Sequence, residues 1–171
     1  MTLSASPPAR SDRPASAPLD SDEEARMERL RAANINPHTG LATDYLNHFN
    51  EAIMLLEMIP DMPECAEDFL TWRPLSYREH FTASKFKARE LAIEAYDAAD
   101  LLIRAEFDNV TSAMTSILTA VGAGMRQAKQ DKTRARLAEQ AIGWVKPLVA
   151  QAGGIINGGT EADVETILAA H

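Results

Sequence analysis

The chain of 171 residues is long enough for one domain with a hydrophobic core, and its charge balance is acidic. It carries 25 Asp and Glu against 17 Lys and Arg, a formal net charge of -8. The acidic excess is concentrated in residues 44–108, which hold 14 acidic and 6 basic side chains. Because phosphate contacts require clustered Lys and Arg, this distribution argues against nucleic acid and favours another protein as the partner.

The cysteine count and the hydropathy pattern indicate the compartment. Cys65 is the only cysteine, so no disulfide can form within the chain, which is typical of the reducing cytoplasm. Residues 1–18 contain no apolar segment of the kind found in a secretory signal. The weakly apolar run at 112–125 is too short to span a bilayer. We therefore expect a cytoplasmic protein with no membrane partner.

The first 33 residues are predicted to form a disordered leader with room for one short helix. Residues 1–20 are rich in Ser, Pro and Ala and have few large apolar side chains. Ordering them would cost conformational entropy that burial of apolar surface could not offset. Ser21 and Glu24 then form a capping-box pattern, which favours a short helix up to Ala33. We interpret the leader as an inert extension, and a docking tail is the alternative.

Residues 44–59 are predicted to form an amphipathic helix that ends before Pro60. Apolar side chains recur at helical spacing and predict a buried stripe made of Tyr45, Phe49, Ala52, Leu56 and Ile59. Asp44, His48 and Glu51 are spaced i, i+4 and i+7 and fall on the opposite side, with Asn47 beside them. The pattern therefore predicts that the imidazole of His48 points away from the core.

The polar face of this helix carries residue types found in metal and proton-transfer sites. His48 and Glu51 are three residues apart, so on a helix both can reach one metal ion or one proton. His80 can join them only if the starts of two helices are adjacent. The alternative, which we prefer, is a solvated or partner-facing polar surface with local side-chain pairing. The candidate binding residues here are Asp44, Asn47, His48, Glu51 and His80, with His48 and Glu51 as the candidate metal ligands.

The same segment resembles the helical hairpins that carry a phosphoacceptor histidine in bacterial signalling proteins. Such a hairpin presents one histidine in mid-helix beside acidic or amide residues, as His48 lies beside Asn47, Asn50 and Glu51. The resemblance implies a site at which the imidazole accepts a phosphoryl group. The neighbouring residues that define those families are absent from this chain, so no family is assigned on this basis.

The connector after this helix contributes two further candidate residues. Trp72 and Arg73 place an aromatic ring beside a cation, a pairing that is enriched at protein interfaces. The alternative, which we prefer for Trp72, is a position in the core. Cys65 lies beside Glu64 and Glu67, and negative neighbours raise a thiol pKa, so we interpret it as a structural residue rather than a reactive one.

Capping signals and hydrophobic spacing predict the next helices in chain order. A short helix is expected over 66–72. A capping box at Ser76 and Glu79 then starts a long helix over 76–107. Residues 108–109, Asp and Asn, predict the break after it, and a helix that continues through them is the alternative.

The C-terminal third is predicted to contain a helix over 135–152 with Trp144 turned inward and a kink at Pro147. A basic run at 126–136 precedes it and is interpreted as a solvated face, with docking onto an acidic surface or contact with nucleic acid as the alternatives. Residues 153–171 are expected to form a Gly-rich hinge and a short C-terminal helix.

These patterns together predict an all-α protein, a bundle-like array of four or five main helices in a domain over residues 34–152. The function we favour is that of a non-enzymatic regulatory or adaptor protein without a cofactor, which acts through protein–protein contacts. Its partner is another protein or a second copy of itself. The alternative is a metal or phosphoacceptor site centred on His48.

Overall fold

The computed structural model describes residues 20–159, so the predictions for 1–19 and 160–171, a disordered leader and a C-terminal helix, lie outside the described residues. The all-α fold is confirmed, with seven α-helices in the described part of the chain rather than the expected four or five. In chain order the elements are α1 (Ser21–Ala32), the 3-10 turn η1 (Thr43–Tyr45), α2 (Leu46–Met58), α3 (Cys65–Thr71), α4 (Tyr77–Ala83), α5 (Arg89–Asp97), α6 (Leu101–Gln127) and α7 (Asp131–Ile156).

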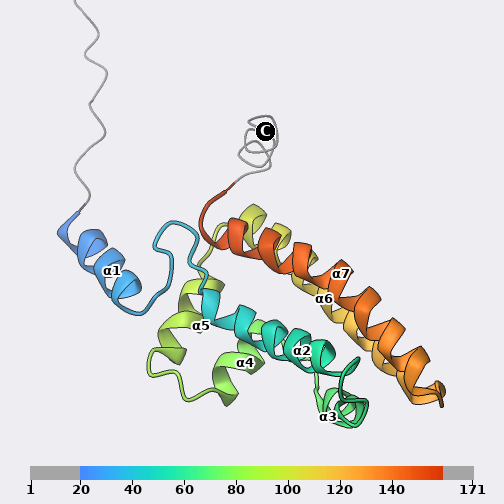
Figure 1. The fold of residues 1–171 in the computed structure, drawn as a ribbon. Coiled ribbons are helices and arrows are strands. Elements are labelled where there is room, and N and C mark those ends of the chain that lie inside the picture. Colours follow the sequence, from blue (N-terminus) through green and yellow to red (C-terminus); the bar gives the residue numbers. More distant parts are fainter. Residues whose placement is uncertain (1–19, 160–171) are drawn as a thin grey trace, which may run out of the picture.

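The long helices α6 and α7 form a hairpin, and α2 packs along α7 (Figure 1). Lys146 Nζ lies 2.6 Å from Glu57 Oε1, and a Cβ atom on Gly153 would lie 3.8 Å from Leu46. Residues later in α7 therefore meet residues earlier in α2, so the two helices run antiparallel. This three-helix unit provides the rigid support for the shorter helices.

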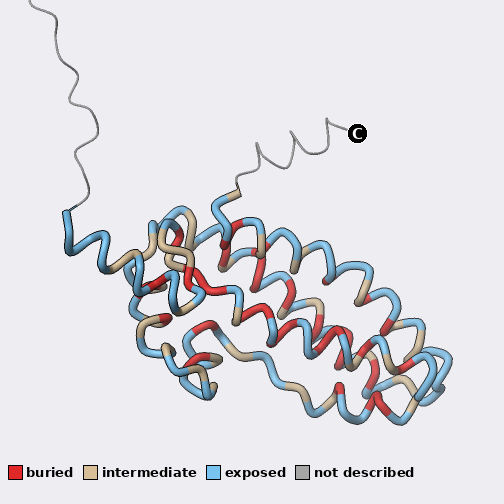
Figure 2. The backbone as a smooth tube through the Cα atoms, turned by 60° about the vertical axis from the view of Figure 1, so that its left-hand side comes forward, coloured by how far each residue is buried: buried red, intermediate tan, exposed pale blue. Residues whose placement is uncertain are grey.

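The core lies where α2, α6 and α7 meet and extends under α3 and α4 (Figure 2). The predicted stripe of α2 is confirmed, because all five of its members are buried. The largest fully buried side chains include Phe49, Leu56, Phe81, Phe107, Met114 and Met125. Within residues 20–159, no helix is both long and apolar enough to cross a membrane.

The prediction of a single long helix over 76–107 is wrong, because this stretch contains α4, α5 and the start of α6. The predicted capping box is confirmed, since Ser76 Oγ accepts from Glu79 N at 3.1 Å and Glu79 Oε1 accepts from Ser76 N at 3.0 Å. Helix α4 ends at Ala83, where Ser84 Oγ donates to a carbonyl of the last turn. Local side-chain bonds of this kind compete with helix continuation.

A second capping residue, Asp100, explains why α6 begins where it does. Its carboxylate accepts from the backbone N–H groups of Leu102 at 2.9 Å and Ile103 at 3.3 Å. The break predicted at 108–109 is therefore wrong, and α6 continues through it to Gln127. Asp108 lies in the interior of α6, and its carboxylate accepts a hydrogen bond from Tyr96 Oη in the preceding helix at 2.7 Å.

Helix α7 is longer than expected and presents a different face to the core. It begins at Asp131 and continues through Pro147 to Ile156, so the hinge expected to begin at residue 153 is wrong. Trp144, expected inside, is 56% exposed, while its neighbour Val145 is fully buried. The backbone turns by about 100° between these two residues, and the packing of α7 on α2 and α6 decides which of them faces inward.

Candidate functional site

His48 is the central residue of the site, and its predicted outward orientation is wrong. The residue is only 6% exposed. Its Nε2 atom accepts a hydrogen bond from the backbone N–H of Leu75 at 2.9 Å, and its ring stacks on Trp72 with 4.6 Å between centroids. Nε2 is therefore unprotonated and the ring is neutral. Burial, and secondarily the charge of His80, lowers the His48 pKa to about 4.

Trp72 completes a clamp between α2 and the segment that leads into α4. Its indole N–H donates to the His48 carbonyl oxygen at 3.2 Å, so the main chain and the side chain of His48 both bind this segment. Arg73, next in the chain, is exposed. The two residues therefore do not form a joint aromatic and cationic anchor: Trp72 packs against the histidine, and Arg73 lies at the surface.

Two tyrosines hold the same segment from the other side. Tyr45 Oη donates to the Leu75 carbonyl oxygen at 2.6 Å, and the Ala42 N–H donates to Tyr77 Oη at 3.0 Å. Desolvation raises the pKa of both phenols well above the ordinary value, so both remain protonated. The start of α2 and the start of α4 are thereby fixed next to each other.

The starts of α2 and α4 are adjacent, and this is the arrangement in which His80 was expected to join the site. His80 Nε2 lies 3.0 Å from Asp44 Oδ2, and their side chains are 14% and 34% exposed. Asn47 Nδ2 donates to the other carboxylate oxygen of Asp44 at 3.4 Å. The His48 and His80 rings are 6.1 Å apart between centroids.

The structure therefore brings together five of the seven candidate residues, namely Asp44, Asn47, His48, Trp72 and His80. Glu51 is exposed, whereas His48 is buried, so the expected stacking of these two residues on one polar face does not occur. In residues 20–159, no three His, Cys, Asp or Glu side chains are arranged to hold a metal ion. Cys65 is buried, and desolvation raises its pKa, in agreement with a structural role.

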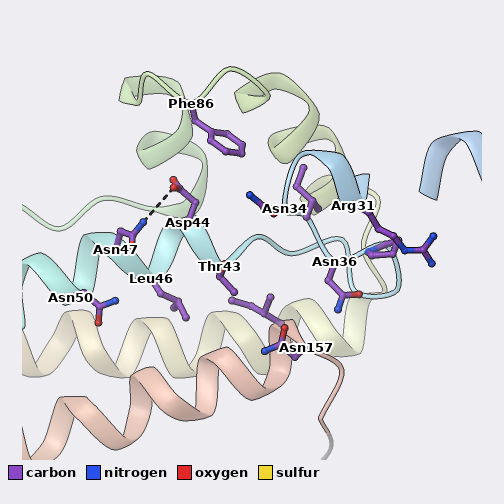
Figure 3. Close-up of a pocket in the computed structure, with 13 residues that line it drawn as sticks. Arg31, Asn34, Asn36, Thr43, Asp44, Leu46, Asn47, Asn50, Phe86 and Asn157 are labelled. Carbon is purple, nitrogen blue, oxygen red and sulfur yellow. Dashed lines mark hydrogen bonds between the residues drawn. The ribbon is translucent and has the colours of Figure 1, made fainter. Parts of the chain in front are cut away.

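A pocket that is open to solvent lies beside Asp44 and Asn47 and has a volume of about 560 Å³ (Figure 3). We call it the amide pocket, because its lining includes the side chains of Asn34, Asn36, Asn47, Asn50 and Asn157. These residues come from the segment after α1, from α2 and from the end of α7. Sequence reasoning placed Asn47 among the candidates but missed Asn34 and Asn157. Asn34 lies two residues before Asn36 in the sequence, and no local pattern singles out Asn157.

The surface also carries large apolar side chains that the core does not cover. Among residues 20–159, these include Trp144 on α7, Met54 on α2, and Leu101 and Leu102 at the start of α6. Two of the five cations of the basic run are used within the chain. Arg126 donates to the Leu70 carbonyl, and Arg134 donates to carbonyls at the end of α6 and to Glu67.

Comparisons of the chain with protein-family models, curated proteins and solved structures find no match. The geometry described above is therefore the basis for assigning a function.

Proposed function

We propose that this chain is a non-enzymatic helical regulatory or adaptor protein that acts through protein–protein contacts, with Trp144 at the centre of the contact surface. The observation that carries the proposal is the 56% exposure of Trp144 on a long helix whose adjacent residue, Val145, is fully buried. Tryptophan has a large apolar surface that is costly to leave in water, and it is enriched among the residues that dominate binding at interfaces.

The surroundings of Trp144 suit such a contact. Leu137 and Leu148 lie seven residues before and four residues after it, so the three side chains share one face of α7. Both leucines are only partly buried. An exposed indole between two partly covered leucines provides the apolar centre that a specific interface requires.

The role of His48 supports a non-enzymatic function. Its Nε2 atom is occupied by a backbone N–H, its ring is stacked on Trp72, and its pKa is lowered to about 4, so at neutral pH it holds no proton to donate as an imidazolium. The alternative of a metal or phosphoacceptor site at His48 has less support for the same reason, because a metal or phosphoryl group on Nε2 would displace the Leu75 hydrogen bond.

The test is to measure association of the purified full chain and of two variants. Light scattering after size exclusion detects a second copy, and affinity capture followed by mass spectrometry detects another protein. Trp144→Ala is expected to weaken the association about tenfold or more, because removal of a central interface tryptophan has effects of this size. Met54→Ala removes another exposed apolar side chain, on α2, and is the matched control that is expected to retain the association.

Two results would contradict the proposal. One is a wild-type chain that remains monomeric at high micromolar concentration and captures the same proteins as Trp144→Ala. The other is equal weakening by both variants, which would indicate nonspecific hydrophobic adhesion rather than a defined surface. Circular dichroism of both variants controls for folding.

A further inference from the structure

The amide pocket is built from segments that are far apart in the sequence. The end of α1 and the loop after it supply Arg31 and Asn34, η1 supplies Asp44, and α2 supplies Asn50. Asn157, the residue that follows α7, completes this set. Figure 3 shows Asp44 extending toward Phe86, with Asn34 directed into the space between Phe86 and Thr43. The pocket volume of about 560 Å³ lies within the size range of small-molecule sites.

Three of the five asparagines of this pocket, Asn34, Asn50 and Asn157, are exposed and have side chains that can bind a ligand. Among the hydrogen bonds of residues 20–159, none involves the side chains of Asn34, Asn50 or Asn157. Each amide can donate two hydrogen bonds and accept others through its oxygen. Asn36 differs, because its side-chain oxygen accepts from the N–H groups of His38 and Thr39 and shapes the loop. The pocket therefore offers several donors and acceptors close together.

The pocket also has an apolar wall. Phe86 is partly buried and packs on Phe81 with 5.6 Å between ring centroids, which holds its ring in place. Leu46, Ile35 and Ile156 are buried residues that complete the lining. A ligand that fits must therefore present an apolar face to an aromatic ring as well as hydrogen-bonding groups to the amides.

The charged residues of the amide pocket narrow the chemical class of its ligand further. The pocket has one cation, Arg31, and one carboxylate, Asp44, which is held by His80 and Asn47. A phosphate ligand is disfavoured because the carboxylate would repel it and only one cation would bind it. A purely apolar ligand is disfavoured because it would remove the amides from water without giving them partners.

We propose that the amide pocket binds a neutral sugar. Vicinal hydroxyls both donate and accept, which matches the side chains of Asn34, Asn50 and Asn157 and the carboxylate of Asp44. The C–H face of a pyranose ring packs against Phe86. This site is independent of the contact surface around Trp144, because Asn157 lies 13 residues further along the chain, about 20 Å at the helical rise.

The test is a titration of ¹⁵N-labelled full chain with glucose, galactose, mannose, ribose and N-acetylglucosamine, followed through the side-chain NH₂ signals of the asparagines. The expected result is saturable shifts of the Asn34, Asn50 and Asn157 signals with at least one sugar. Asn50→Ala is expected to weaken that affinity about fivefold, the effect of losing one or two neutral hydrogen bonds. Asn109→Ala, an exposed asparagine on α6 outside the pocket, is the matched control and is expected to leave the affinity unchanged.

Three results would overturn the sugar assignment. The first is the absence of saturable shifts with every sugar of the panel. The second is equal affinity in Asn50→Ala and Asn109→Ala, which would place the sugar elsewhere. The third is saturable binding of a blocked alanine dipeptide where the sugars fail, which would assign the amides to recognition of a peptide backbone. Phe86→Leu provides a second variant, and it is expected to weaken sugar binding while the fold, checked by circular dichroism, is retained.

Discussion

His48 links α2 to the segment before α4 through its side chain and its main chain. Nε2 accepts from the Leu75 N–H, and the His48 carbonyl accepts from the Trp72 indole. A buried backbone N–H needs a partner, since leaving one unpaired costs free energy comparable to a lost hydrogen bond. The histidine therefore stabilises the fold at a position where an apolar side chain of similar size would leave the Leu75 N–H without a partner.

Replacing His48 is expected to lower the stability of the fold. His48→Ala removes the acceptor for Leu75 N–H and the ring that stacks on Trp72, and we expect a loss of about 2–4 kcal/mol in the free energy of unfolding. Urea denaturation measures this change in the free energy of unfolding. Glu51→Ala, at an exposed position three residues later, is the control and should change stability by less than about 0.5 kcal/mol. Equal effects of the two substitutions would contradict the structural role of His48.

The same histidine should make stability depend on pH. Its pKa is lowered from 6.5 to about 4 in the folded protein, so below pH 6.5 the unfolded chain binds a proton that the folded protein does not. The stabilisation is therefore complete above pH 6.5 and is lost as the pH falls toward 4, by up to about 3 kcal/mol. Denaturation curves from pH 7.5 to 5, above the range where carboxylates titrate, measure the slope. His48→Gln should flatten that slope, and an unchanged slope would rule out His48 as its source.

At the scale of elements, the loop between α1 and α2 is held by a turn that only glycine fits. Gly40 has a φ of +73°, and a Cβ atom there would lie 2.7 Å from the carbonyl oxygen of Ala95 in α5. The Gly40 N–H donates to the Asn36 carbonyl at 2.7 Å, and Thr39 Oγ1 donates to the Ile156 carbonyl at the end of α7. This loop therefore connects α5, α7 and the amide pocket.

Two glycines form a matched test of this arrangement. Gly40→Ala should lower the free energy of unfolding by about 2 kcal/mol or more, because it combines backbone strain with a backbone clash. Gly143→Ala, in the interior of α7 with nothing within 4 Å of a new Cβ, should raise it by about 0.5–1 kcal/mol through helix propensity. Thermal unfolding of both variants measures the two effects. Changes of the same sign would contradict the conformation described for one of these positions.

At the scale of the whole molecule, α7 carries both proposed surfaces. Trp144 lies near its middle, and Asn157 follows its last residue at the edge of the amide pocket. The α6–α7 hairpin with α2 against it makes these two positions parts of one rigid support, but they are separated by about 20 Å along α7 at the helical rise. Energetic effects at separated sites without shared partners are usually additive.

We therefore expect the two surfaces to behave independently. Trp144→Ala should leave sugar affinity unchanged, and Asn50→Ala should leave protein association unchanged, with the double variant showing the sum of both free-energy effects within about 0.5 kcal/mol. Titrations of the three variants with a sugar and with the protein partner measure both affinities. Marked nonadditivity would mean that both ligands compete for one surface or change the fold.

The sequence alone determined the features that depend on local chemistry. The all-α fold, the buried stripe of α2 and the capping box at Ser76 and Glu79 follow from hydrophobic spacing and from side chains that bond to the backbone a few residues away. The adjacency of Asp44 and Asn47 was also visible, because i and i+3 residues are neighbours on a helix.

Only the tertiary structure decided which way several side chains face. His48 is buried because Trp72 and Leu75, 24 and 27 residues later in the chain, supply its partners, and helical periodicity contains no information about them. Trp144 is exposed because α2 and α6 pack against the neighbouring face of α7. The amide pocket arises for the same reason, since its asparagines become neighbours only when the end of α7 meets the start of α2. Long-range packing, rather than local propensity, determines each of these positions.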